Sequence, residues 1–217
     1  MPAARATFER ARTLYGQLQR ASTGPKQRFF RHLSNEISRA LAETEYYAAR
    51  LDAALAAAHD SIDGFTSLTL EMPYLADMKA HLGESYLLLA RVLQGQGDLA
   101  AALAALEKSR GILLPIHEAD PNHSRWSTLL AREQLALARI SRQRGELAAA
   151  QRALSLADTL TAGVTSESLL LTQDARAQTL LELDRGEAAR PLLEHLRSLG
   201  WQDDLTHRDF ARLAAQQ

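Results

Sequence analysis

The sequence predicts an all-α fold, an α-solenoid of about four helical hairpins with a preceding N-terminal helix and a C-terminal capping helix. Three observations lead to this prediction. Apolar residues recur with helical spacing along most of the chain, and alternation typical of strands is almost absent. Gly and Pro interrupt the helical pattern at intervals that suit helix lengths. Two long segments also repeat one another without gaps.

Composition narrows the classes of function. The chain has 217 residues, a net charge of −1 and no cysteine, so disulfides, thiolate nucleophiles and cysteine zinc sites are excluded. Because the charge is close to zero, no nucleic-acid partner is expected. The longest apolar run, Tyr86 to Ala90, is far shorter than a bilayer span, and no direct membrane insertion is expected. The N-terminus carries no apolar region of a signal peptide.

The chain is interpreted as a single helical-repeat domain, residues 1–217. An N-terminal helix precedes Gly24-Pro25, and a closing helix follows Gly200. The expected hairpins and closing helix occupy approximately residues 26–61, 73–119, 125–161, 165–199 and 204–216.

The first hairpin carries the weakest repeat signal. Its turn is predicted at Thr44, which stands where the later copies have glycine. Asp63-Gly64 and Pro73 are both turn signals, so the apolar segment between them is predicted to be a long loop that folds back onto the array.

The second and third hairpins carry the clear repeat. Residues 86–106 align with residues 134–154, and each segment contains an amphipathic helix, a Gly-acid-Leu turn and an Ala-rich helix. Gly97 and Gly145 can supply the positive φ that ends the first helix. The acid that follows each glycine stands at the next helix's N-terminus, where the helix dipole favours negative charge. A weaker fourth turn is predicted at Gly186, so the predicted turns at positions 44, 97, 145 and 186 come closer together along the chain.

The repeat resembles the tetratricopeptide repeat, whose small residues lie where two helix backbones cross closely. The resemblance covers about residues 26 to 217, and it is good at the small positions and poor at the aromatic ones. The matching residues of the second hairpin are Tyr86, Leu89, Ala90, Leu93, Ala102, Leu106 and Ser109. Those of the third are Gln134, Leu137, Ala138, Ser141, Ala150, Leu154 and Ala157.

Two short stretches resemble one subfamily, the long-helix repeats found carboxy-terminal to bacterial serine/threonine kinase domains. One is Asp120-Pro121-Asn122 with Arg125-Trp126, and the other is the tail from Leu199 to Leu213. The tail resembles the short helix that closes such arrays and covers the last apolar face.

No motif in the sequence predicts catalysis, a metal or a cofactor. Gly95-Gln-Gly97 formally begins a dinucleotide fingerprint, but a helix precedes it where that motif needs a strand. The seven histidines show no metal-ligand spacing. The one dense acid and histidine cluster, residues 203–209, is explained more simply by capping of the closing helix. The chain is therefore expected not to be an enzyme, although an unrecognised helical site is kept as an alternative.

The resemblance places the ligand-contacting positions on the first helix of each hairpin, and these positions include several arginines. Their spacing puts them on one helical face. Arginines there suit an acidic or carboxylate-terminated peptide through bidentate hydrogen bonds, with ordinary solvated surface charges as the alternative. The predicted groove residues are Glu84, Leu87, Arg91, Arg132, Leu135, Arg139, Arg142 and Arg176. In the first hairpin the positions fall near Arg31, Ser34 and Ser38, and in the fourth near Gln173 and Arg176.

The leading functional hypothesis is a non-catalytic protein- or peptide-binding domain, which the resemblance implies is the sensory or regulatory region of a bacterial serine/threonine kinase. The alternative is a free-standing scaffold, secretion chaperone or transcription-regulator interaction module. Self-association is left open. The compartment is periplasmic if the domain belongs to a membrane-anchored kinase and cytoplasmic otherwise.

Overall fold

The computed structural model describes residues 2–162, 173, 176–177, 180 and 186–198. It confirms the all-α prediction, because these residues form helices and connections and no strand. The helices are α1 (Pro2–Arg20), α2 (Gly24–Tyr47), α3 (Leu51–Glu71), α4 (Ala76–Gln96), α5 (Leu99–Ala119), α6 (Ser124–Gln143), α7 (Leu147–Thr161) and α9 (Gly186–Ser198).

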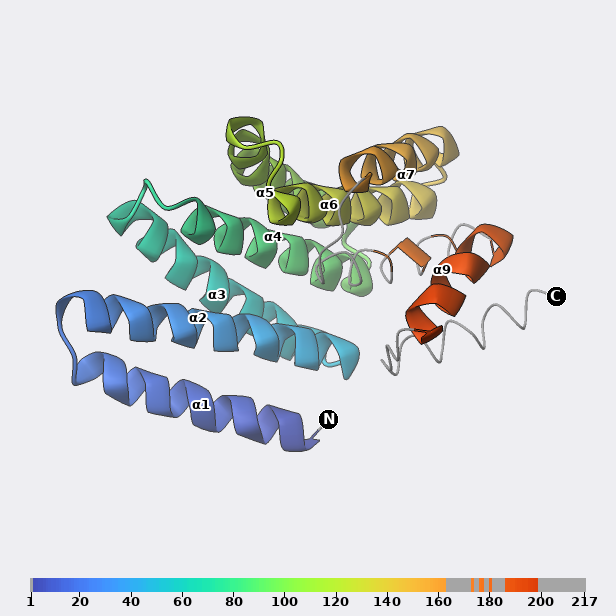
Figure 1. Cartoon of the computed structure of the whole chain (residues 1–217). Coiled ribbons are helices and arrows are strands. Elements are labelled where there is room, and N and C mark those ends of the chain that lie inside the picture. Colours follow the sequence, from blue (N-terminus) through green and yellow to red (C-terminus); the bar gives the residue numbers. More distant parts are fainter. Residues whose placement is uncertain (1, 163–172, 174–175, 178–179, 181–185, 199–217) are drawn as a thin grey trace. The chain divides into compact units, whose positions relative to one another are not determined.

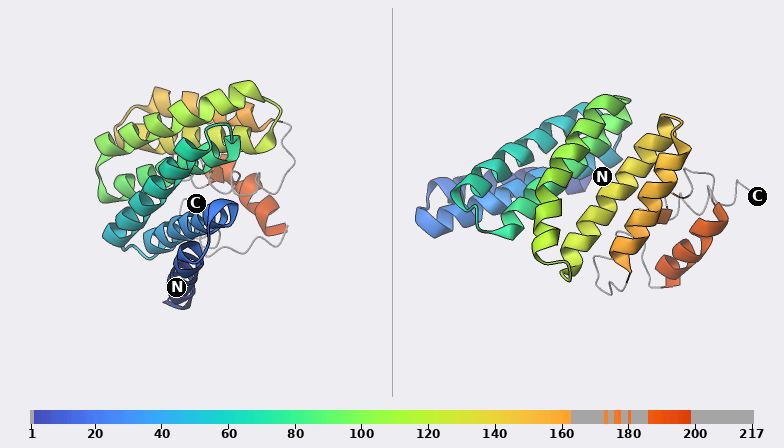
Figure 2. Two further views of the ribbon diagram at one scale, coloured as in Figure 1. Left: turned by 90° about the vertical axis from the view of Figure 1, so that its left-hand side faces the viewer. Right: turned by 90° about the horizontal axis from the view of Figure 1, so that it is seen from above.

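The chain divides into two compact units, residues 1–116 and 117–217. In the first unit the helices pack in chain order, α1 on α2, α2 on α3 and α3 on α4, and α2 also contacts α4 (Figure 1). In the second unit α6 and α7 pack along one another (Figure 2). Each of these helices thus packs on its neighbour in the sequence, which is the arrangement of stacked helical hairpins.

Three hairpin corners have the same backbone. Gly97 and Gly145 have φ values of 85° and 79°, and Ala49 has a φ of 57°. In each corner this residue donates its N–H to a carbonyl three residues back, and the next residue donates to a carbonyl five residues back. This is the glycine-type helix ending that satisfies the last carbonyl groups of a helix.

The three corners are also evenly spaced. The step from Ala49 to Gly97 has the same length as the step from Gly97 to Gly145, and we call this step one period. Positions that differ by one period are therefore equivalent in successive hairpins.

The prediction of the first corner at Thr44 was wrong. Thr44 lies inside α2, where its hydroxyl donates to the carbonyl of Ala40. The corner is at Ala49, which adopts the left-handed conformation without being glycine. The sequence signal failed because a search for the corner depends on a glycine that this copy lacks.

The predicted loop between Asp63 and Pro73 was also wrong, because α3 continues as helix to Glu71. Gly64 is a packing position instead of a turn. A Cβ atom there would lie 2.1 Å from the side-chain oxygen of Asn35 on α2. A glycine inside a helical pattern commonly has such a packing reason.

Small residues occupy the buried crossings in all three hairpins. Ala42, Ala90 and Ala138 recur one period apart in the first helices, and all three are fully buried. The equivalent places in the second helices hold Ala54, Ala102 and Ala150, which are buried as well. This confirms that the small positions of the repeat lie in the core, where they allow close helix packing.

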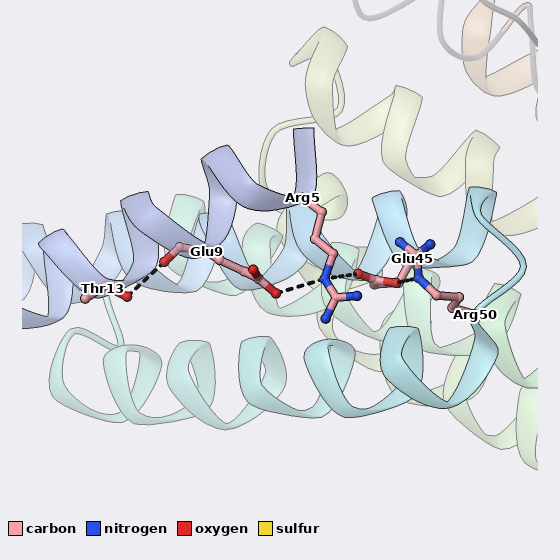
Figure 3. Close-up of polar contacts among 5 residues, drawn as sticks. All are labelled: Arg5, Glu9, Thr13, Glu45 and Arg50. Carbon is pink, nitrogen blue, oxygen red and sulfur yellow. Dashed lines mark hydrogen bonds and ion pairs between the residues drawn. The ribbon is translucent and has the colours of Figure 1, made fainter. Parts of the chain in front are cut away.

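A buried carboxylate secures the end of α2 beside the first corner. Glu45 has a side chain that is 4% exposed, and it pairs with Arg50 of the corner and, at 3.3 Å, with Arg5 of α1 (Figure 3). Arg5 also pairs with Glu9 one turn along α1 at 2.8 Å. The negative charge of Glu45 is therefore paired with two guanidinium groups, as a buried carboxylate requires.

The second corner is stabilised by a helix cap instead of a buried ion pair. Asp98 accepts a hydrogen bond from the N–H of Ala101 at 2.9 Å and so caps α5, at the helix N-terminus where its negative charge was predicted. Farther along this hairpin, Ser109 donates to the carbonyl of Gly83 at 2.9 Å. The close contact of α4 and α5 depends on Gly83, because a Cβ there would lie 2.6 Å from Leu113.

The closing helix predicted at 204–216 lies outside the described residues, as does most of the first helix of the fourth hairpin. The second helix of that hairpin is α9. None of the helices in the described part of the chain combines the length and the apolar character that crossing a bilayer requires.

Candidate functional site

The three corners define which residues of the first helices are equivalent. The four positions predicted to contact a ligand in the third hairpin have equivalents one period earlier in α4 and two periods earlier in α2. Their offsets of 0, 3, 7 and 10 keep each set on one helical face. The sets are Arg132, Leu135, Arg139 and Arg142 in α6; Glu84, Leu87, Arg91 and Gln94 in α4; and Glu36, Arg39, Glu43 and Tyr46 in α2.

The prediction for the first hairpin is therefore corrected. Arg31, Ser34 and Ser38 follow from a corner at Thr44, and the corner at Ala49 moves each position farther along the helix. Arg31 faces α3 instead, where it pairs with Glu71 at 2.7 Å and donates to the hydroxyl of Ser67. Ser38 is buried.

Glu36 is the centre of a charged cluster between α2 and α4. Its carboxylate lies 2.6 Å from Arg39 and 2.9 Å from Nδ1 of His81, and the same nitrogen lies 3.4 Å from Glu84. Burial alone would raise the pKa of Glu36, but the hydrogen bond with His81 and the positive charge of Arg39 outweigh it and lower the pKa to about 2. Glu36 is thus firmly ionised in the folded protein.

Arg39 is surrounded by carboxylates. Its side chain is 20% exposed. Burial lowers the pKa of Arg39, but the negative charges of Glu84, Glu36 and Glu43 outweigh the burial and raise the pKa above its ordinary value. The three acids and the arginine form a network in which the charges of α2 and α4 offset one another.

The imidazole of His81 is held by rings as well as by carboxylates. It stacks on Phe65 of α3 with ring centroids 5.1 Å apart, and it meets His32 of α2 edge to face at 4.9 Å. Phe65 is fully buried. His81, Glu36 and Phe65 therefore tie three helices together at one point. Sequence reasoning missed this cluster, although the corrected corner would have placed Glu36 and Arg39 on the predicted face.

Arg91, a predicted groove residue, is engaged within its own unit. Its guanidinium carbon lies 5.0 Å from the ring centroid of Tyr46 and 5.5 Å from that of Tyr47, and it donates a hydrogen bond to the Tyr47 hydroxyl at 3.1 Å. Burial lowers the pKa of Arg91, but the electrostatic effects of Tyr47, Tyr46 and Glu43 outweigh it and raise the pKa. Its neighbour Leu87, another predicted residue, is buried.

The same positions of α6 have a different chemistry. Arg132, Arg139 and Arg142 occupy three of the four, and no acid stands among them. Arg139 is 8% exposed and Leu135 is fully buried, while Arg132 and Arg142 are half-buried. Each of the three arginines makes an interaction within the chain. The nearest acid in sequence, Glu133, is buried.

Arg176, the last predicted groove residue, pairs with Asp158 of α7 at 2.5 Å. The described residues also form an open hollow on α1, and a single face of that helix lines it: Ala6, Glu9, Arg10, Thr13, Leu14 and Gln17. Nothing about this hollow indicates a reaction. In the part of the chain that the structure describes, no three His, Cys, Asp or Glu side chains are grouped to hold a metal ion.

Comparison with known proteins returned no match from the family models, the curated proteins or the solved structures.

Proposed function

We propose that this chain is a non-catalytic module that binds an acidic or carboxylate-terminated polypeptide through the first-helix face of its third hairpin. One observation carries the proposal. The repeat keeps the backbone of the corner in three hairpins, yet the four face positions change from a mixture of acids and arginines in α2 and α4 to three arginines without an acid in α6. Because the fold tolerates both sets, the arginines are explained better by recognition than by packing.

The chemistry of the proposed ligand follows from the side chains. Guanidinium groups bind carboxylates bidentately, and three of them stand along one face of α6. In the first unit, Arg39 and Arg91 already bind the carboxylates and tyrosines of their own unit. We assign the ligand to Arg132, Arg139 and Arg142 because three arginines share this face and no acid stands at its four positions; the ligand's carboxylates add to the contacts that these arginines already make.

The proposed biological setting is regulatory. The resemblance of residues 120–126 to repeats beside bacterial serine/threonine kinases supports a sensory or regulatory region of such a kinase, with a free-standing interaction module as the alternative. The sequence of the parent gene tests this directly. Kinase motifs in the same reading frame support the regulatory region, and their absence contradicts it.

Binding is tested with fluorescent peptides rich in Asp and Glu, with either a free or an amidated C-terminus. We expect Arg139→Glu and Arg142→Glu each to weaken binding by at least about tenfold, because each introduces repulsion at a charge-paired contact. Binding is also expected to weaken with added salt. Fluorescence polarisation measures both effects.

The matched control is Gln94→Glu, which adds a negative charge at the position of α4 that corresponds to Arg142. We expect it to leave the affinity within about twofold. If charge reversal at Arg139 and Arg142 leaves the affinity unchanged while the proteins stay folded, the arginine face is not the ligand site.

A further inference from the structure

The two connections between hairpins have the same backbone hydrogen bond. Residues 72–75 join α3 to α4, residues 120–123 join α5 to α6, and Pro73 and Pro121 stand one period apart. In the first connection, the N–H of Leu75 donates to the carbonyl of Met72 at 3.1 Å. In the second, the N–H of His123 donates to the carbonyl of Asp120 at 3.2 Å. The two connections are therefore copies of one turn.

The side chains of the two copies have opposite polarity. The first connection and the end of α3 before it carry Leu70, Met72, Tyr74 and Leu75. The positions one period later, at the end of α5 and in the second connection, carry Glu118, Asp120, Asn122 and His123. Leu70 is 78% exposed and Tyr74 is 79% exposed, and Leu75 is exposed as well. Since the polar copy builds the same turn, the fold does not require apolar residues here. We name Leu70, Tyr74 and Leu75 the apolar tip.

Basic residues outnumber acidic ones at the end of the first unit that carries the apolar tip. The α1–α2 connection lies at the same end of the first unit as the α3–α4 connection (Figure 1). The last residue of α1 and the first residues of α2 and α4, which adjoin these connections, carry four basic residues, Arg20, Lys26, Arg28 and Lys79. The acids at this end are fewer: Glu71 is paired with Arg31 at 2.7 Å, and Asp77 lies in the first turn of α4. Basic residues near exposed apolar side chains are complementary to a surface whose outer layer is negatively charged and whose interior is apolar.

We propose that the apolar tip binds the surface of an anionic membrane. The side chains of Leu70 and Tyr74 are 78% and 79% exposed at a turn, so both are available for shallow contact with the headgroup region of a membrane. Leu and Tyr side chains partition into the interface between headgroups and acyl chains, and Lys and Arg attract anionic headgroups. This is contact at the membrane surface by a turn, and it does not depend on the proposed function.

The test is co-flotation of the full chain with vesicles of phosphatidylcholine alone or mixed with phosphatidylglycerol. The tip is replaced by its own polar copy, with the substitutions Leu70→Glu, Tyr74→Asn and Leu75→His. We expect the wild-type chain to float with the anionic vesicles at low salt, and the replaced chain to partition at least about tenfold more weakly. The double variant Lys26→Glu/Arg28→Glu leaves the apolar tip intact. We expect it to bind anionic vesicles more weakly than the wild-type chain and to show a smaller effect of added salt on that binding.

Circular dichroism and thermal melting check that the replaced chain stays folded. If it does not, Tyr74→Asn alone serves as the test, because a side chain that is 79% exposed contributes little packing. The proposal is overturned if the wild-type chain does not float with anionic vesicles, or if the replacement leaves flotation unchanged. It is also overturned if the tip is needed for self-association or for binding a protein in the absence of lipid.

Discussion

The first and third hairpins share one backbone corner and differ in almost everything attached to it. In the first, the corner residue is Ala49, and the face of α2 carries acids that pair with arginine and histidine. In the third, the corner residue is Gly145, and the equivalent face of α6 carries three arginines. The hairpins therefore share the corner geometry and the small residues at the helix crossings, whereas the side chains on the face of the first helix differ from one hairpin to the next.

The strongest test of this comparison removes the centre of the cluster in the first unit. Glu36→Ala leaves Arg39 and His81, whose side chains are 20% and 13% exposed, without their shared carboxylate. We expect a loss of about 2 kcal/mol in the free energy of unfolding, because the charge-assisted hydrogen bonds to Arg39 and His81 are lost while Glu84 still lies beside His81. Urea denaturation followed by circular dichroism measures it.

The control for this prediction is Glu9→Ala, which removes a carboxylate from the same unit at an exposed position. It is expected to cost less than about 1 kcal/mol. If the two substitutions cost the same, the cluster is an ordinary surface network and the contrast between the hairpins loses its energetic basis.

Acid should act on the same cluster. The pKa of Glu36 is about 2 in the folded protein, against an ordinary value of 4.5. Because the pKa of Glu36 is lower in the folded chain than in the unfolded chain, its ionised carboxylate stabilises the fold above about pH 4.5. This stability is lost as the pH falls from about 4.5 towards 2. Because the Glu36 side chain is 26% exposed and solvent screens its interactions, the contribution is on the order of 2 kcal/mol. Denaturation across this range should show a shallower pH dependence for Glu36→Gln than for the wild-type chain, and equal slopes would contradict the assignment.

The equivalence of the later corners is tested by Gly97→Ala and Gly145→Ala. No atom lies within 4 Å of a Cβ built at either position, so the cost is conformational and not steric. Each substitution is expected to lower the free energy of unfolding by about 1 kcal/mol, because an L-residue is strained at positive φ. The measurement is again urea denaturation, and markedly different costs in the two variants would show that the two corners are not copies.

The smallest expected effect is a gain. Ala49→Gly relieves the strain at a φ of 57° and is expected to raise the free energy of unfolding by about 0.5 to 1 kcal/mol, measured by the same denaturation. Its neighbour Ala48 has a φ of −84°, so Ala48→Gly serves as the control and should destabilise the chain. A loss of stability in Ala49→Gly would mean that the first corner is held by something other than backbone preference.

Much of the fold follows from the sequence because glycine marks a corner through its own physics. Gly97 and Gly145 were predicted as corners, and both have positive φ. The small residues of the crossings were also predicted, since helices that approach closely must carry them. The errors arose where one residue type serves two purposes. Gly64 was interpreted as a turn, but it accommodates Asn35.

The candidate site was harder to predict, because it depends on the register of the first hairpin. Ala49 gives no turn signal, so the predicted face of α2 missed Glu36, Arg39 and Glu43. The pairing of His81 with Glu36 joins two helices that are far apart in the chain, and no local pattern contains it. The arginines of α6 were predicted as a shared face, and their ligand stays a prediction.

The equal steps between corners have a consequence for how the chain can change length. Between the corners at Ala49 and Gly145, removal or duplication of one period rejoins the chain at equivalent positions and keeps the helical phase. Any other insertion in a helix would rotate the residues beyond it away from their neighbours. Only a change of whole periods therefore keeps the helical phase of the residues beyond it, and the deletion of residues 50–97, which removes α3 and α4 together, is one such change.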